Sequence, residues 1–141
     1  MKIPEELVYT KSHEWARRLP AAPPGAAQAG EATEVMVGIT AHAQEELRDI
    51  VFVELPKVGK TVKQGEPAAV IESVKAAFDI YAPVSGTIAR VNEAVVKLPQ
   101  LVNQDCYGAG WLFAVTPSNV KEFAGLMTAD TYTNQLKAET H

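Results

Sequence analysis

The fold is decided by the stretch Val70-Ile71-Glu72-Ser73-Val74-Lys75-Ala76-Ala77-Phe78-Asp79-Ile80-Tyr81, which reads as a strand, a short tip and a second strand. β-Branched and aromatic residues on both sides of a polar tip favour strands. The tip lacks Gly and Asn-Gly, the usual hairpin signals, and carries Lys75 instead. A lysine at such a tip is open to a modifying enzyme, although spacing alone equally fits a lysine that only aids solubility.

Two registers of this hairpin are open. If the turn is centred on residues 74–75, Ile71 faces Phe78 in an apolar cross-strand pair. A shift of one residue places Glu72 opposite Asp79, and like charges in that position repel each other. We favour the first register, although the sequence does not decide between them.

The same pattern of short strands continues on both sides of the hairpin, with turn signals about every ten residues. The expected strands are 7–10, 13–17, 33–39, 50–55, 68–72, 77–81, 87–92 and 111–115, with a loop at 97–110. This pattern predicts a mainly β fold, a flattened barrel or sandwich of two antiparallel sheets with short helices.

Helix signals are few. Thr40 is a suitable N-cap for a short helix over residues 41–47. Asn119 followed by Glu122 resembles a capping pair, and a final helix is expected over residues 129–136. The C-terminal part of the chain is therefore predicted to be helical.

The chain is expected to form one domain over residues 1–141, with its helical part starting at about residue 118. That length suffices for a substantial core. Residues 20–32 are rich in Pro, Ala and Gly and contain no large apolar side chain, so we expect a mobile loop there.

Composition excludes several function classes. The net charge is −4, from 13 Lys and Arg and 17 Asp and Glu, which argues against nucleic-acid binding. No apolar run reaches the length of a membrane span. The start, Met1-Lys2-Ile3-Pro4-Glu5-Glu6, has no targeting pattern. We therefore expect a cytoplasmic protein, or a mitochondrial matrix protein if the chain is a processed eukaryotic form.

Cysteine and histidine give no catalytic pattern. Cys106 is the single cysteine, so no intramolecular disulfide forms, and with no basic neighbour to activate it we interpret it as structural. His13, His42 and His141 are far apart in the sequence, so no metal site is predicted.

The stretch 72–76, followed by residues 79–86, resembles the lipoyl-attachment stretch of the glycine cleavage H proteins. The resemblance extends over about residues 7–136 apart from 20–32. The other matching segments are Tyr9-Thr10, His13-Glu14-Trp15, Val37-Gly38-Ile39-Thr40, Asp49 to Pro56, Val91-Asn92-Glu93, Leu101-Val102-Asn103 and Tyr107 to Leu112. Arg48 departs from the pattern where the family usually has Gly, and Cys106 where it commonly has Pro.

The resemblance implies a lipoyl-domain-like fold and a carrier that catalyses nothing by itself. Lipoate would be attached to Lys75, within the motif formed with Glu72, Ser73, Val74 and Ala76. The arm would take the aminomethyl group of glycine from a pyridoxal-phosphate decarboxylase (P protein) to a tetrahydrofolate-dependent aminomethyltransferase (T protein). A dihydrolipoyl dehydrogenase (L protein) would then reoxidise it, and a lipoate-attaching enzyme would load it at the outset.

The resemblance also places Ser12, Glu14 and Asp79 near a cleft for the loaded arm. A carboxylate there could pair with the protonated amine that the arm carries. The alternative for Glu14 and Asp79 is an ordinary solvated surface acid.

Two other functions remain open at this point. The chain could be a lipoyl relay protein in cofactor assembly, or an unmodified β-domain that only binds partners. A biotin carrier is disfavoured because biotinylated lysines usually lie between methionines, whereas Lys75 lies between Val74 and Ala76.

Overall fold

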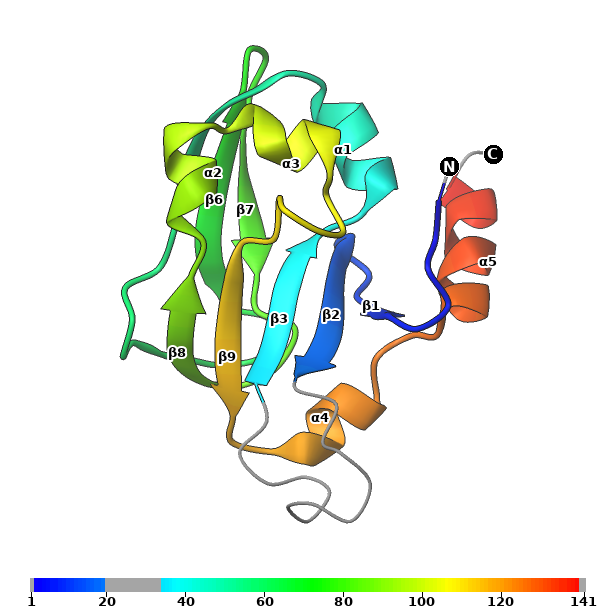
Figure 1. Ribbon diagram of the computed structural model, residues 1–141. Coiled ribbons are helices and arrows are strands. Elements are labelled where there is room, and N and C mark those ends of the chain that lie inside the picture. The colour runs from blue at the N-terminus through cyan, green and yellow to red at the C-terminus, as the bar shows by residue number, and fades with distance from the viewer. Residues whose placement is uncertain (1, 20–33, 140–141) are drawn as a thin grey trace.

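The computed structural model describes residues 2–19 and 34–139, which fold into two antiparallel sheets with short helices around them (Figure 1). The larger sheet has the strand order β1-β2-β3-β9-β8-β5, and the smaller has the order β4-β6-β7. The strands are β1 Val8–Tyr9, β2 Glu14–Leu19, β3 Glu34–Ile39, β4 Ile50–Glu54, β5 Thr61–Val62, β6 Pro67–Ser73, β7 Ala77–Tyr81, β8 Gly86–Val91 and β9 Phe113–Pro117. The expected fold class is confirmed, and the open edges make it a sandwich and not a closed barrel. The loop predicted at residues 20–32 lies outside the described residues.

The main core lies between the two sheets. Alternate residues of β3, namely Val35, Val37 and Ile39, are each no more than 1% exposed, as the period of two requires. They belong to the same buried cluster as Ile71 of β6 and Ile80 of β7. The hairpin that carries Lys75 is thus anchored in the core at its base.

The helices are α1 Ala41–Leu47, α2 Glu93–Lys97, α3 Gln100–Gln104, α4 Val120–Ala124 and α5 Ala129–Glu139. Thr40 caps α1 by accepting a hydrogen bond from the Ala43 amide, as predicted. None of the helices in the described part of the chain is long and apolar enough to cross a bilayer.

The prediction of a loop over residues 97–110 was wrong in part, because this segment contains α3 and the last residue of α2. Each of these helices has five residues, too short for a helical period to show in the sequence. Tertiary contacts hold α3 instead: the Asn103 side chain accepts from the Ile50 amide at 3.0 Å and donates to the Arg48 carbonyl at 2.6 Å.

The capping pair expected at 119–122 is half correct. The Asn119 side chain accepts from the Lys121 amide at 3.0 Å and caps α4. Glu122 does not complete the pair, because its carboxylate accepts from the Ser85 amide and hydroxyl at 2.7 and 3.0 Å. That side chain therefore joins α4 to the start of β8.

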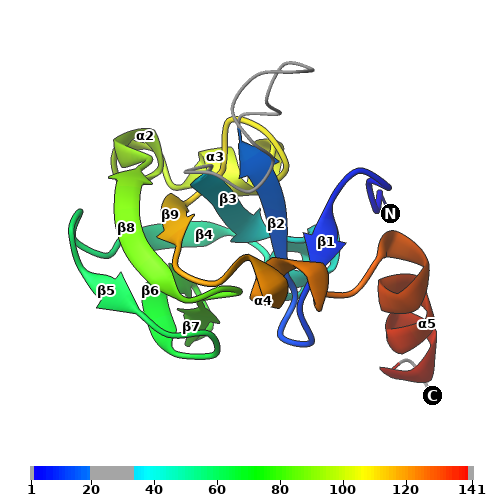
Figure 2. The same ribbon diagram turned by 90° about the horizontal axis from the view of Figure 1, so that it is seen from below.

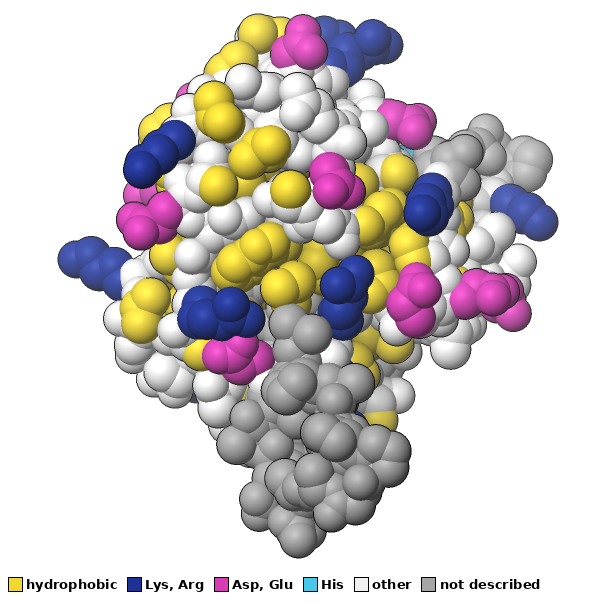
Figure 3. Space-filling view, viewed as in Figure 1, with side chains coloured by type: hydrophobic (Ala, Val, Ile, Leu, Met, Phe, Trp, Pro, Cys, Tyr) yellow, Lys and Arg dark blue, Asp and Glu magenta, His cyan; other side chains and the backbone are white. Residues whose placement is uncertain are grey.

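A second apolar cluster attaches α5 to the edge of the larger sheet, where Figure 2 shows the helix beside β1. The rings of Tyr9 and Tyr132 stack with centroids 4.7 Å apart. Trp15 of the same cluster is fully buried, and its indole N–H donates to the Cys106 carbonyl at 2.8 Å. Apolar side chains also gather in the middle of the face seen in Figure 3, over the larger sheet.

Candidate functional site: the hairpin tip and the clefts beside it

The tip of the β6–β7 hairpin is a two-residue turn closed by Ser73. The Ser73 amide donates to the Ala76 carbonyl at 2.8 Å, and the Ile71–Phe78 pairing confirms the favoured register. The Ser73 hydroxyl accepts from the amides of Lys75 and Ala76 at 3.2 and 3.3 Å. A side-chain hydroxyl thus stabilises a turn that has no glycine.

The tip is also tied to the body of the protein. The Val74 amide donates to the Asp49 carbonyl at 3.3 Å, which connects the turn to the residue before β4. Ser73 is buried, whereas Val74 is 69% exposed and Lys75 is exposed as well. In Figure 1 the β6–β7 loop forms the uppermost point of the molecule. The structure therefore presents an accessible lysine on a fixed backbone, which suits the attachment of a group to its amine.

The other members of the predicted motif also lie at this tip. Glu72 and Ala76 are exposed on either side of the turn. Beside it lies a hollow of about 390 Å³, here called the tip hollow, lined by His42, Glu45, Glu46, Arg48 and Lys75. The tip hollow separates the lysine from helix α1.

Ser12 and Asp79 come together in a small cleft of about 90 Å³, here called the Asp79 cleft. Its other lining residues are His13, Ile39, Ala43, Glu46, Leu47, Phe78 and Ile80. Asp79 itself is exposed on β7. The cleft therefore offers one hydroxyl and carboxylates above an apolar floor.

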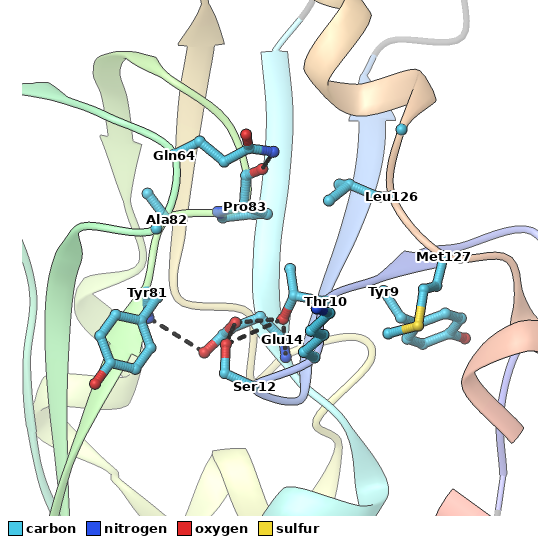
Figure 4. A pocket seen from close by; sticks show the side chains of 13 residues that line it. Tyr9, Thr10, Ser12, Glu14, Gln64, Tyr81, Ala82, Pro83, Leu126 and Met127 are labelled. Atoms are coloured by element: carbon cyan, nitrogen blue, oxygen red, sulfur yellow. Dashed lines mark hydrogen bonds between the residues drawn. The ribbon is translucent and has the colours of Figure 1, made fainter. Parts of the chain in front are cut away.

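Glu14 lies in a different place, against a cavity of about 340 Å³ that Ser12 also lines (Figure 4). Its carboxylate accepts from the hydroxyls of Thr10 and Ser12 at 2.5 and 2.6 Å and from the Tyr81 amide at 3.2 Å. Glu14 is 1% exposed, so the interpretation as a solvated surface acid was wrong. Burial raises the pKa of Glu14, and its hydrogen bonds oppose that rise.

The three residues predicted for the cleft are thus only partly brought together. Ser12 borders both spaces, whereas Asp79 borders one and Glu14 the other. Thr10 and Tyr81 were not predicted as site residues, but both form hydrogen bonds with the Glu14 carboxylate. Tyr81 contributes its backbone amide, a group that no side-chain pattern could have indicated.

The histidines are closer than their sequence positions suggested. The ring centroids of His13 and His42 lie 4.6 Å apart, so the argument from scattered positions was wrong for this pair. Their side chains lie near Glu139 at the end of α5. His141 lies outside the described residues.

Cys106 is 7% exposed, and burial raises the pKa of its thiol to about 11. A thiol with that pKa stays protonated near neutral pH. The structure is therefore consistent with a structural cysteine.

Comparison with known proteins agrees with the geometry of the tip. The family described as Glycine cleavage H-protein matches residues 7–139. A glycine cleavage system H protein from Thermus thermophilus is 49% identical over 139 residues, which cover 99% of each chain. One from Shewanella oneidensis is 53% identical over 130 residues, 92% of each chain. The crystal structure of such a protein from Mycobacterium marinum superposes with a TM-score of 0.83 at 43% identity, covering 96% of this chain and 99% of the other. The chain therefore belongs to the glycine cleavage H-protein family.

Proposed function

We propose that this protein is the lipoyl carrier of glycine cleavage and that lipoate is attached to Lys75 through an amide. The observation that carries the proposal is the placement of Lys75, exposed in a turn whose backbone is held by Ser73. Amide formation removes the lysine charge. Because the tip is exposed, the charge that is lost is a solvated one and not a buried one.

The distance along β7 fits an arm that folds back against the protein. Antiparallel strands rise about 3.4 Å per residue, so Asp79 lies roughly 7 Å along β7 from Ala77, its first residue, and Lys75 lies in the turn two residues before Ala77. About a dozen bonds separate the lysine Cα from the lipoyl sulfurs, which gives a reach of roughly 15 Å in extended form. The Asp79 cleft is therefore within reach of the end of the arm.

Lipoate attached there would supply a disulfide for redox chemistry and a sulfur that can carry an aminomethyl group. The chain's own residues hold and shelter what the arm carries. In the Asp79 cleft, the Asp79 carboxylate and the Ser12 hydroxyl could both bind an ammonium group. Glu14 acts indirectly, because its carboxylate accepts a hydrogen bond from the Ser12 hydroxyl and so fixes the position of that hydroxyl.

The carrier role implies partners that act on the arm in turn. These are the decarboxylase, the aminomethyltransferase and the dihydrolipoyl dehydrogenase of glycine cleavage, together with a lipoate-attaching enzyme. The chain is a carrier without catalytic activity of its own. We place it in the cytoplasm because the relatives that it matches are bacterial proteins, or in the mitochondrial matrix for a processed eukaryotic form.

Intact mass tests the attachment site. After incubation with lipoate and the attaching enzyme, the wild-type chain should gain the mass of one lipoyl group, and Lys75→Arg should gain none. Lys60→Arg, at another exposed lysine, is the matched control and should be modified fully. Lipoylation of Lys75→Arg would show that the site lies elsewhere.

Glycine–bicarbonate exchange with the decarboxylase tests the role in glycine cleavage. The lipoylated wild-type chain should support exchange, and the Lys75→Arg variant should not. A fully lipoylated chain that supports no exchange would contradict the glycine cleavage role and favour a relay function.

A further inference from the structure

Three potential metal ligands, His13, His42 and Glu139, come close together from three separate parts of the chain, and Glu46 of α1 lies beside His42. His13 comes from the turn before β2, His42 and Glu46 from α1, and Glu139 from the end of α5. The Nε2 atom of His13 lies 3.3 Å from Oε1 of Glu139. The Nε2 atom of His42 lies 3.3 Å from Oε1 of Glu46 and 3.9 Å from Oε1 of Glu139.

The His42 ring has an unusual environment. Its Nε2 atom is the buried polar side-chain atom of the described residues that makes no hydrogen bond, although Oε1 of Glu46 lies 3.3 Å away. Buried polar atoms in folded proteins are almost always paired, so such an atom needs an explanation. A metal ion at this position would supply the missing partner.

The other nitrogen of His13 is held in the way that a metal-binding histidine requires. Its Nδ1 atom lies 2.7 Å from the Tyr132 hydroxyl, which lies 2.8 Å from Oγ1 of Thr40. If Nδ1–H donates to Tyr132 and Tyr132 donates to Thr40, then Nε2 carries a free lone pair. Metal-bound histidines commonly have such a hydrogen bond at their second nitrogen. Thr40 is itself fixed as the cap of α1.

The spacing of the ligand atoms suits a tetrahedral zinc site. Bonds of about 2.0–2.1 Å to zinc place tetrahedral ligand atoms about 3.4 Å apart. Two of the distances above are 3.3 Å, and the ligand atoms of His13, His42 and Glu139 all lie within 4.8 Å of one another. The remaining distances, among them 3.9 Å between His42 and Glu139, would shorten when the ion binds. Two imidazole nitrogens favour a transition metal over Mg²⁺ and Ca²⁺, which prefer oxygen ligands.

We propose that His13, His42 and Glu139, with Glu46 as the fourth ligand, bind a zinc-class divalent ion. The ion would link α5 and α1 to the turn that carries His13. Since Ser12 and Glu14 flank His13 in that turn, the ion would also hold the residues that border the Asp79 cleft. This site does not depend on the lipoyl arm.

Isothermal titration of Zn²⁺ into the untagged, chelator-treated full chain tests the proposal. We use the lipoylated protein with its arm oxidised, because reduced thiols bind zinc themselves. One ion should bind per chain, Co²⁺ should give the visible absorption of a tetrahedral site, and Mg²⁺ should give no binding. Lys75→Arg should bind Zn²⁺ as the wild type does, which separates this site from the arm.

Variants at the ligands identify the site. His42→Gln and Glu139→Gln should each lower zinc affinity about tenfold or more, whereas Glu45→Gln, at an exposed neighbour on α1, should leave it unchanged. Circular dichroism checks that each variant is folded. Glu139 is 40% exposed at a helix end, so its substitution should not disturb folding even if that of His42 does. Absence of one-to-one binding, or wild-type affinity in both ligand variants, would overturn the proposal and leave an ordinary set of ion pairs.

Discussion

Glu14 and Asp79 have the same kind of charged group in opposite environments. Glu14 is buried and accepts hydrogen bonds from Thr10, Ser12 and Tyr81, so its lone pairs are already engaged. Asp79 is exposed and lines the Asp79 cleft. Of the two, Asp79 is therefore the carboxylate that we propose for an incoming ammonium, whereas the Glu14 carboxylate is engaged in local hydrogen bonds.

Asp79→Asn should accelerate the loss of ammonia from the aminomethyl-loaded carrier when no transferase is present. Partly exposed ion pairs contribute up to about 1 kcal/mol, so the rate should rise by at most about fivefold. Ammonia release is followed over time, with Glu54→Gln, an exposed acid on β4, as the control. An unchanged rate in Asp79→Asn would mean that Asp79 does not hold the amine.

Glu14→Gln should instead lower the free energy of unfolding by about 1–3 kcal/mol, because one amide group cannot accept all the donors that now point at the carboxylate. Asp79→Asn should change it by less than about 0.5 kcal/mol. Urea denaturation of both variants gives the comparison. Equal stability of the two variants would contradict the structural role of Glu14.

Cys106 should react slowly with thiol reagents in the folded protein. Its pKa is raised from 9.0 to about 11, so at pH 8 the thiolate fraction is about 100-fold smaller than that of an ordinary thiol. The rate of reaction with an aromatic disulfide should rise as the pH approaches 11 and should be high at pH 8 in guanidinium. Rapid reaction of the folded protein at pH 8 would contradict the buried environment.

At the scale of single elements, the hairpin of β6 and β7 could be predicted because its register depends on local pairs. Ile71 against Phe78 was the more favourable pairing, and it is the one found. The helix α3 could not be predicted, since it depends on Asn103 bonding to Ile50 and Arg48 about fifty residues earlier. Local pattern thus decides the strands, and distant contacts decide the shortest helices.

Arg48 ends α1 with φ 62° and ψ −136°, a backbone conformation that suits glycine. A side chain in a sparsely populated region costs about 1–3 kcal/mol, and the added freedom of Gly in the unfolded chain offsets about 0.5–1 kcal/mol of that. Arg48→Gly should therefore raise the free energy of unfolding by about 1 kcal/mol in urea denaturation.

Arg48→Ala is the matched variant, because it removes the long side chain and keeps the Cβ atom that causes the strain. It should give no increase in stability. If the alanine variant gains as much as the glycine variant, the arginine side chain and not the backbone is the unfavourable part.

At the scale of the whole molecule, the two apolar clusters meet across the larger sheet. Tyr9 and Trp15 of the second cluster lie on β1 and β2, and β2 pairs directly with β3 of the main core. Backbone hydrogen bonds of the sheet therefore run from β1, against which α5 packs, to the strands of the main core. The expectation of one domain over residues 1–141 stays a prediction.

The two clusters should unfold together. Tryptophan fluorescence reports the second cluster, to which both Trp15 and Trp111 belong, and far-ultraviolet circular dichroism reports the sheets. Both signals should give the same urea midpoint, because single domains of this size usually unfold in one step. Two separate midpoints would show that the α5 side unfolds independently.

The candidate site could be predicted only in part, because it depends on how the two sheets pack against each other. Lys75 and Asp79 lie only four residues apart, one in the hairpin turn and the other on β7, so the sequence could relate them. Ser12 reaches the same cleft only because β2 and the hairpin belong to different sheets that face each other. The proximity of His13 and His42 likewise depends on tertiary packing, which the spacing of the two residues along the chain does not reveal.

If lipoate is attached to Lys75 as proposed, the turn closed by the Ser73 hydroxyl affects how the attaching enzyme binds the chain. Ordering one residue of a flexible chain costs about 1–2 kcal/mol of conformational entropy. Here Ser73 has already immobilised the amides of Lys75 and Ala76, so the enzyme meets a preorganised substrate. A free peptide spanning residues 71–78 would have to be ordered during binding. It should be a much poorer substrate than the folded domain, although it presents the same side chains.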